Sequence, residues 1–216
     1  MSTASGAKFW TQHYSAGVPA EIDTSGYRSV VDLFEQSVQQ FRERSAYVCM
    51  GKKLSFAEVD AYSRKLAAYL QSVGIKQGTR VAIMMPNCLQ YPIAIFAVLR
   101  MGGIVVNVNP MYTPRELEHQ LKDSGAEAIV ILENFAHTLQ AVIAQTSVKR
   151  VIVATLGDLL GIPKGWIVNL VVRKLKKMVP AWELPGHVPF NDAIARGAAA
   201  NFAKPELTLD DVAFLQ

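Results

Sequence analysis

Short apolar runs alternate with longer amphipathic stretches through the middle of this chain. Nearly continuous apolar runs, typical of buried strands, occupy residues 80–85, 104–109, 127–132 and 150–154. Helical spacing of apolar residues between them predicts helices over 89–101, 113–125 and 134–145. Because apolar strands that alternate with helices form βαβ units, the pattern predicts an α/β fold: a mostly parallel, doubly wound sheet with flanking helices.

Two predicted helices begin at residues that can cap their own first turn. Ser55 and Glu58 have the spacing of a capping box, in which each side chain bonds the other residue's backbone N–H. Thr113 and Glu116 repeat this spacing, and Pro114 lies at the first helical position, where a missing N–H costs nothing. Both sequences therefore predict well-defined helix starts.

The pattern divides the chain into four segments. Residues 1–27 predict an extended N-terminal arm, and residues 28–154 predict the α/β subdomain, which opens with a helix and a hairpin. Residues 155–208 are interrupted by glycine and proline and predict an irregular, basic, amphipathic segment. Residues 209–216 predict a strand, which we expect to be a central member of the sheet.

The composition indicates a globular protein whose positive charge is concentrated in one place. Half of the residues are hydrophobic and 19% are charged, and the net charge of +4 does not indicate a nucleic-acid partner. Between residues 159 and 182, however, there are five basic residues and no acidic one. The basic character is therefore local.

No stretch predicts a signal peptide or a membrane-spanning helix. The uncharged run 81–99 is interrupted by Pro86 and Pro92, so it predicts strand, loop and buried helix instead. Cys49 and Cys88 lie far apart among apolar residues, which predicts free thiols and fits a cytosolic protein.

The basic segment 165–179 has two interpretations. On a helical wheel, one face carries Val168, Val171, Val172, Leu175, Met178 and Val179. The other face carries Asn169, Arg173, Lys174, Lys176 and Lys177, with Trp166 and Leu170. Such a helix can lie on an anionic membrane, with Trp166, Arg173, Lys174, Lys176 and Lys177 as the membrane contacts. It can equally pack on the domain with its lysines in solvent, and the pattern leaves both interpretations open.

Candidate ligand contacts follow the predicted strands, because ligands bind outside the carboxyl ends of strands in open α/β sheets. Asn87 follows the first strand, and Asn107, Asn109 and Tyr112 follow the second. These side chains either line a cleft or simply make the turns. The chain has no phosphate-binding glycine loop, and its histidines lack metal-ligand spacing. We assign no catalytic, cofactor-binding or metal-binding residue.

Several runs resemble the acyl-CoA synthetases of the adenylate-forming, or AMP-binding, superfamily. They are LSFAEV, GIKQGTRVAIMMPN, VNVNPMYTPREL and LKDSGAEAIVI. FWTQHYSAGVPAEID and VVRKLKKMVPAWELP are similar to the bacterial long-chain fatty-acid–CoA ligases in particular. The resemblance covers essentially the whole chain and implies the N-terminal part of the large adenylate-forming domain.

The resemblance implies a two-step activity that uses ATP, Mg²⁺ and CoA. A fatty acid and ATP give an acyl-adenylate and pyrophosphate, and the CoA thiol then displaces AMP. A medium-chain or aryl acid is the alternative substrate. In this family the phosphate loop follows a strand that matches VAFLQ, so the chain resembles a fragment without the catalytic motifs, which we expect to be inactive alone.

Long-chain acids partition into bilayers, so a ligase of this kind has a reason to touch the membrane. The resemblance implies a cytoplasmic protein, peripherally associated with the inner face of the membrane, whose partners are fatty acid, ATP, CoA and anionic lipid. Apolar surface at the end of the sheet would also allow self-association. The remaining alternative is a stand-alone, non-enzymatic module that binds a ligand or a membrane surface.

Overall fold

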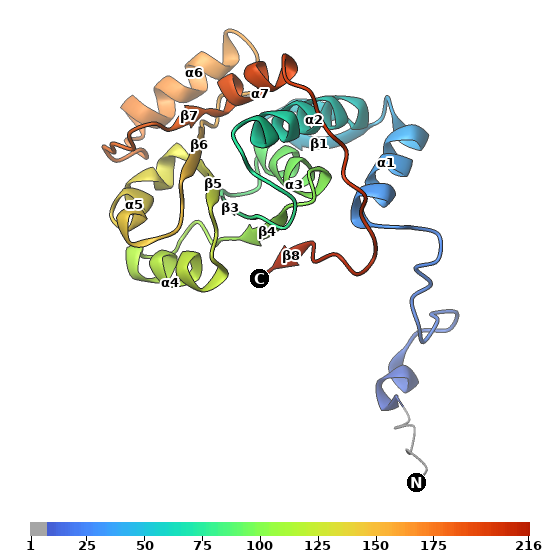
Figure 1. Cartoon of the computed structure of the whole chain (residues 1–216). Helices are drawn as coiled ribbons and strands as arrows, with labels where there is room; N and C mark the ends of the chain where they lie inside the picture. The colour runs from blue at the N-terminus through green and yellow to red at the C-terminus, as the bar shows by residue number, and fades with distance from the viewer. Residues whose placement is uncertain (1–7) are drawn as a thin grey trace.

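A six-stranded parallel sheet forms the centre of the protein. The computed structural model describes residues 8–216. The strands are β3 (Arg80–Met84), β4 (Ile104–Asn107), β5 (Ala128–Leu132), β6 (Arg150–Ala154), β7 (Val188–Pro189) and β8 (Phe214–Leu215). Their order is β7-β6-β5-β3-β4-β8, and every neighbouring pair is parallel (Figure 1). The predicted α/β class and parallel sheet are confirmed.

Helices cover both faces of this sheet, as a doubly wound fold requires. They are α1 (Val30–Phe41), α2 (Phe56–Ser72), α3 (Gln90–Arg100), α4 (Pro114–Ser124), α5 (Ala136–Gln140), α6 (Lys164–Leu170) and α7 (Phe190–Ala198). One apolar core lies between the sheet and α1, α2, α3 and α7, and a second lies between the sheet and α4 and α5. An antiparallel hairpin, β1 (Ser45–Cys49) and β2 (Lys52–Ser55), precedes α2.

The alternation of side chains along β3 explains why the sheet needs two cores. Val81 and Ile83 point into the first core, and Ala82 and Met84 point into the second. All four are fully buried. Successive side chains of a strand face opposite sides, so a strand that is apolar at every position must be covered on both.

Both predicted capping boxes are present. Ser55 Oγ accepts a hydrogen bond from the Glu58 N–H at 3.1 Å, and the Glu58 carboxylate accepts one from the Ser55 N–H at 2.8 Å. Thr113 and Glu116 make the same exchange at the start of α4, which ends at Gly125 in the left-handed conformation. These helix starts are local, which is why sequence alone predicts them.

The helix predicted over 134–145 is broken into three short pieces. They are a 3₁₀ turn η2 (Glu133–Phe135), α5, and a second 3₁₀ turn η3 (Ile143–Gln145). Glu133 and Asn134 bond to the segment after α6 instead of capping a helix of their own. Tertiary contacts therefore override the local helical pattern here.

Residues 155–208 contain more regular structure than the glycines and prolines predicted. Besides α6, they form β7, which pairs with β6, and α7, which packs on α2. At this contact Gly197 approaches the backbone of α2 so closely that an added Cβ would lie 2.7 Å from the Lys65 carbonyl carbon. Only glycine permits this approach without moving the helix.

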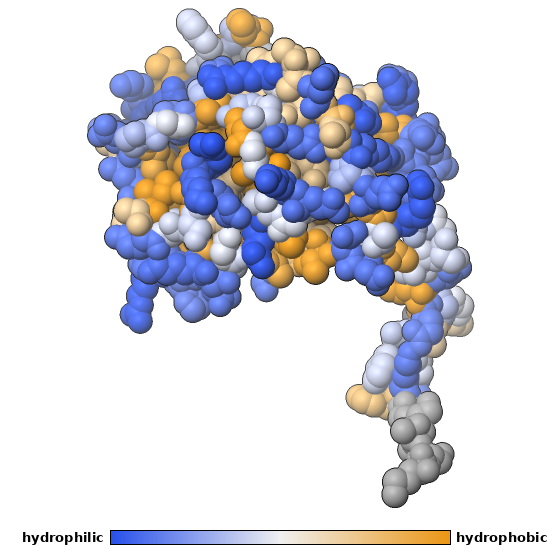
Figure 2. All heavy atoms as spheres, in the orientation of Figure 1, coloured by the Kyte–Doolittle hydropathy of each residue, from blue (hydrophilic) through white to orange (hydrophobic). Residues whose placement is uncertain are grey.

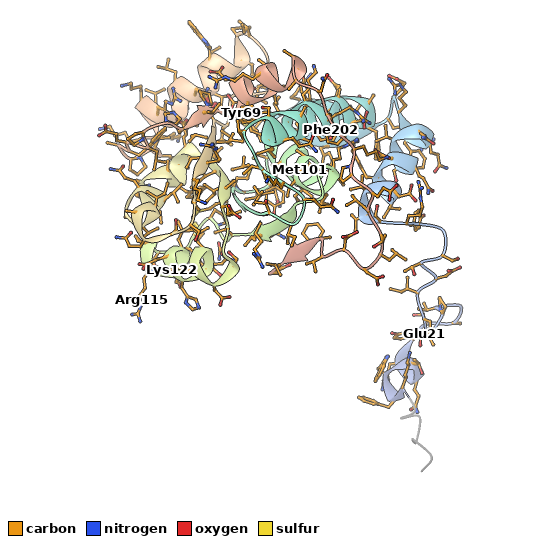
Figure 3. The ribbon with its side chains drawn as sticks, in the orientation of Figure 1. Glu21, Tyr69, Met101, Arg115, Lys122 and Phe202 are labelled. Carbon is orange, nitrogen blue, oxygen red and sulfur yellow. The ribbon has the colours of Figure 1, made fainter. Side chains whose placement is uncertain are left out.

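The chain after α7 crosses α2 and returns to the sheet as β8 (Figure 1). The Gln71 side chain holds this strap by bonding both the carbonyl and the N–H of Ala203, at 2.8 and 3.0 Å. Phe202 accordingly lies over α2 (Figure 3). The strap brings β8 beside β4, so the final strand occupies the outer position of the described sheet and the expected central position is wrong.

The described part of the N-terminal arm, residues 8–27, extends away from the body of the protein (Figure 1). It contains one 3₁₀ turn, η1 (Phe9–His13), and Lys8 forms an ion pair with Glu21. Residues 1–7 of the predicted arm lie outside the described residues. The division of the chain into four segments stays a prediction.

Candidate functional site

The carboxyl ends of β3, β4, β5 and β6 meet at one edge of the sheet, where a ligand of this fold is expected. An apolar cavity of about 320 Å³ lies beside β3 at this edge. Its lining residues come from β1, from the loop between β3 and α3, and from the first two turns of α3. They are Tyr47, Val48, Cys49, Asn87, Cys88, Leu89, Tyr91, Pro92, Ile95 and Phe96. Asn87 is therefore the candidate that faces a cavity.

The other three candidates have different surroundings. Asn107 accepts a hydrogen bond from the Tyr91 hydroxyl at 2.8 Å. It therefore fixes the position of Tyr91, which lines the cavity. Asn109 accepts from the Met111 N–H at 3.0 Å, which closes a turn, and Tyr112 packs against the second core. Asn107 thus contacts the cavity wall through Tyr91, whereas Asn109 closes the turn.

Both cysteines are free, as predicted, and neither belongs to a nucleophile motif. Burial raises the pKa of the Cys88 thiol to about 11. Because the thiolate is the reactive form, Cys88 stays protonated and unreactive at neutral pH. The cavity, which Cys49 also lines, offers apolar contact and the Asn87 amide.

A polar network follows β6 and holds the last turn of α6. Thr155 donates to the Asp158 carboxylate from its N–H and its hydroxyl, both at 2.8 Å. Asn169 bonds back to this loop, to the Thr155 hydroxyl at 2.9 Å and the Gly157 N–H at 2.8 Å. Burial raises the pKa of Asp158, against the hydrogen bonds from Thr155 that lower it. Asn169, which the helical wheel placed on the solvated face, thus points into the protein.

A second connection joins the end of β5 to the segment after α6. Glu133 is 2% exposed, and its carboxylate accepts bonds from Arg173 Nε at 2.9 and 3.0 Å and from Arg173 Nη2 at 2.7 Å. This hydrogen bonding raises the pKa of Arg173. Asn134 adds a bond to the Met178 carbonyl at 3.0 Å. Of the five predicted membrane contacts, Arg173 is thus already paired within the protein.

The helix of the basic segment changes its winding at Val171. Residues Val171–Leu175 form a π-helical turn, closed by the Lys176 N–H on the Val171 carbonyl at 2.8 Å. The wider turn carries Leu175 and Met178 out to solvent, where they are 73% and 56% exposed. The helical wheel, which grouped them with the buried Val172, is wrong at this point because it assumes uniform α-helical spacing.

The lysines after α6, Lys174, Lys176 and Lys177, are all exposed, and so is Trp166. Arg115 and Lys122, on α4, lie on the opposite side of the protein (Figure 3). Within residues 8–216, no helix is both long and apolar enough to cross a membrane. The uncharged run 81–99 instead contains most of β3 and of α3, as predicted.

Comparison of the sequence with known protein families shows which family the chain belongs to. The sequence pattern of the AMP-binding enzyme family matches residues 34–216. The chain belongs to the AMP-binding enzyme family. The resemblance seen in its sequence is thereby confirmed, although its last strand lies at the outer position of the sheet.

Sequence relatives place the chain within this family. It is 52% identical over 210 residues to the long-chain-fatty-acid–CoA ligase of Escherichia coli O6:H1, which covers 97% of this chain and 37% of that protein. It is 33% identical over 167 residues to the ligase of the same name from Bacillus subtilis strain 168, covering 77% of this chain and 30% of that one. The chain thus spans little more than a third of the length of the Escherichia coli ligase and slightly less than a third of the Bacillus subtilis ligase.

Solved structures of the family share the fold. The anthranilate CoA ligase AuaEII, in complex with anthranoyl-AMP, superposes with a TM-score of 0.70 at 16% identity, over 89% of this chain and 33% of that one. A long-chain-fatty-acid-CoA ligase from Archaeoglobus fulgidus superposes with a TM-score of 0.67 at 22% identity, over 93% and 36%. The arrangement of sheet and helices is therefore that of the adenylate-forming ligases.

Proposed function

We propose that this chain is part of an ATP-dependent long-chain fatty-acid–CoA ligase. The observation that carries the proposal is the 52% identity to a ligase of that name over 97% of the chain. In the proposed reaction, a fatty acid and ATP form an acyl-adenylate and pyrophosphate, and CoA then takes the acyl group and releases AMP. Adenylation matters because a carboxylate is a poor electrophile and AMP supplies its leaving group.

The residues described here provide the scaffold of such a site. The carboxyl ends of the strands form one side of the proposed site. The hydrogen bond from Tyr91 to Asn107 fixes one wall of the cavity next to these strand ends. Residues 8–216 contain no cluster of three or more His, Cys, Asp or Glu side chains that fits a metal ion. The proposed binding of Mg²⁺ and of the ATP phosphates is therefore assigned to none of these residues.

Acyl-chain profiling of the full-length ligase tests this proposal. We expect ATP–pyrophosphate exchange and acyl-CoA formation with palmitate or oleate to exceed those with octanoate or 4-coumarate by at least tenfold in kcat/KM. The 216-residue chain alone is the control and is expected to give no exchange. Exchange by the 216-residue chain would contradict the expectation that this part of the ligase is inactive alone. Absence of exchange by the full-length protein would refute the ligase activity.

A medium-chain or aryl acid is the second candidate substrate. It is favoured by the 36% identity over 100 residues to 4-coumarate–CoA ligase 5 of rice, although that match covers only 45% of this chain. A preference for octanoate or 4-coumarate in the same profile would support it. The stand-alone, non-enzymatic module is disfavoured, because the family match extends over residues 34–216.

We further propose that the ligase is cytoplasmic and binds the inner face of the membrane through the segment around α6. The proposed contacts are Trp166, Lys174, Lys176 and Lys177, and Arg173 contributes by anchoring this segment to Glu133. Each lysine near an anionic bilayer contributes about 1 kcal/mol. The absence of acidic residues from 159 to 182 leaves this attraction uncompensated.

Removing the charges of Lys174, Lys176 and Lys177 tests the membrane role. Replacing all three by Gln is expected to weaken binding of the full-length protein to vesicles with anionic lipid roughly a hundredfold. Arg115→Gln, Lys122→Gln and Lys149→Gln together remove the same charge elsewhere and should change binding little. Equal binding of the wild-type protein to neutral and anionic vesicles would contradict the proposal.

Self-association is proposed at the outer edge of the sheet. Leu209, Val212 and Phe214 are exposed beside β8. Figure 2 shows hydrophobic surface where Figure 1 draws this strand. A strand edge flanked by apolar side chains is a usual place for chains to pair, and sedimentation velocity would detect such pairing.

A further inference from the structure

We propose that the tip of the β1–β2 hairpin and the turn before α6 join the exposed side of α6 to form one surface that inserts into an anionic bilayer. The apolar side chains of this insertion surface are Val48 and Met50 from the hairpin, Ile162 from the turn, and Trp166 and Leu170 from α6. The inference rests on the membrane role proposed above and adds two segments to it.

The hairpin and α6 are far apart in sequence but adjacent in the structure. Lys164 Nζ, at the start of α6, donates a hydrogen bond to the Met50 carbonyl oxygen across 114 positions. A Cβ added at Gly51 would lie 3.4 Å from the same Nζ. Lys52 of the hairpin also lines one open cavity of about 640 Å³ together with Ile162 and Trp166, and other walls of this cavity come from α2 and α7. The three segments therefore face the same space.

The apolar side chains of the insertion surface are largely exposed to solvent. Ile162 is 92% exposed and Trp166 81%, and more than half of Val48 and of Leu170 is exposed. A single exposed apolar residue is common on a protein surface and needs no explanation. Five of them gathered from three segments form a patch of the kind that marks an interaction site.

The tip of the β1–β2 hairpin places a methionine in a backbone conformation that is unfavourable for this residue. Its two-residue connection has positive φ at both positions, +51° at Met50 and +75° at Gly51. This pattern belongs to the type I′ turn, which prefers Asn, Asp or Gly at the first position because a longer side chain is strained there. Methionine is a poor choice for the turn but supplies a flexible apolar side chain at its tip.

Charge identifies the partner as anionic lipid. The hairpin contributes Lys52 and Lys53 to this region, and α6 and the turn after it contribute Lys164 and Lys174. Residues 45–57 and 159–182 contain no acid, and the nearby Asp158, Glu133 and Glu58 are paired within the protein, with Thr155, Arg173 and Lys52 respectively. Protein interfaces are depleted in lysine, whereas a surface that combines Trp, aliphatic side chains and lysine is typical of peripheral membrane binding.

The test uses the full-length ligase with Met50→Asn and Ile162→Ser combined, and vesicles of phosphatidylcholine with phosphatidylglycerol. We expect about tenfold weaker vesicle binding, because two inserting side chains lose their apolar burial. The thermal midpoint should stay unchanged or rise, since Asn suits the type I′ turn. Ile22→Ser with Met111→Ser is the matched control, because it removes one exposed isoleucine and one exposed methionine elsewhere, and it should bind as the wild type.

Each outcome separates this inference from the proposals on which it rests. Wild-type binding by the Met50 and Ile162 variant, with binding lost on removal of the three lysines, would refute the insertion surface and leave the role of α6. A lower thermal midpoint without lipid would show that protein covers this surface, which also refutes the inference. ATP–pyrophosphate exchange with detergent-dispersed palmitate reports on the ligase activity separately and should be equal in all variants.

Discussion

Replacing both Glu35 and Asp60 by alanine is expected to lower the free energy of unfolding by about 3–5 kcal/mol, because the Arg100 guanidinium then stays buried without a partner. Arg100 lies on α3 and is 1% exposed. Its Nη1 contacts Glu35 at 3.2 Å, and its Nη2 is bonded to Asp60. Burial lowers the pKa of Arg100, and the coulombic attraction of Asp60 and Glu35 opposes that shift.

Urea unfolding followed by circular dichroism measures this effect. Adding Arg100→Met to the double variant should restore at least half of the lost stability, since an apolar side chain of similar length suits the site better than an unpaired charge. Glu118→Ala with Glu127→Ala removes two carboxylates from exposed ion pairs and should cost less than about 1 kcal/mol. A loss of that small size in the Glu35 and Asp60 variant would contradict the importance of the buried pair.

The parts of the fold that sequence alone predicts are those decided by neighbours along the chain. Capping boxes need residues three positions apart, and a buried parallel strand needs only a short apolar run. For this reason the helix starts at Ser55 and Thr113 and the four central strands agree with the structure. The family resemblance has the same basis, because it depends on contiguous runs of residues.

The element α7 was missed although its signal is present in the sequence. Its buried residues Phe190, Ala193, Ile194 and Gly197 follow the i, i+3, i+4, i+7 spacing of a helix face. The glycines and prolines of residues 155–208 instead predict an irregular segment. Gly197 reads as a helix breaker, yet the structure uses it to bring α7 against the backbone of α2.

Long-range partners explain the remaining differences. Arg100 is the last residue of the otherwise mostly apolar α3, and its partners Asp60 and Glu35 lie 40 and 65 positions away. The helix predicted over 134–145 is interrupted because Glu133 and Asn134 bond to a segment 40 or more positions downstream. No local pattern reveals such pairs.

Sequence patterns also predict only part of the candidate site, because some of its contacts are long-range. The rule that ligands bind at the carboxyl ends of strands selected four polar residues, and one of them, Asn87, lines a cavity. Tyr91, which was not selected, connects that cavity to Asn107 through a hydrogen bond between α3 and β4. Its role depends on how α3 packs beside the next strand, which sequence spacing does not specify.

Replacing Arg173 by alanine is expected to lower the free energy of unfolding by about 2–3 kcal/mol, whereas Lys174→Ala should change it by less than about 0.5 kcal/mol. The two cations are adjacent in sequence, but only Arg173 bonds the buried carboxylate of Glu133. Its loss leaves that carboxylate unpaired at the end of β5 and frees the π-helical turn. Lys174 is exposed and belongs to the proposed membrane contacts.

Thermal unfolding and vesicle binding of the full-length ligase together distinguish the two roles. Lys174→Ala should keep the wild-type thermal midpoint and weaken binding to anionic vesicles about fivefold. Arg173→Ala should lower the midpoint, and adding Glu133→Gln should recover much of that loss, because a neutral amide tolerates burial better than an unpaired carboxylate. If Glu133→Gln gave no recovery, the stability would not depend on this buried pair, and Arg173 would act as one more cation at the membrane surface.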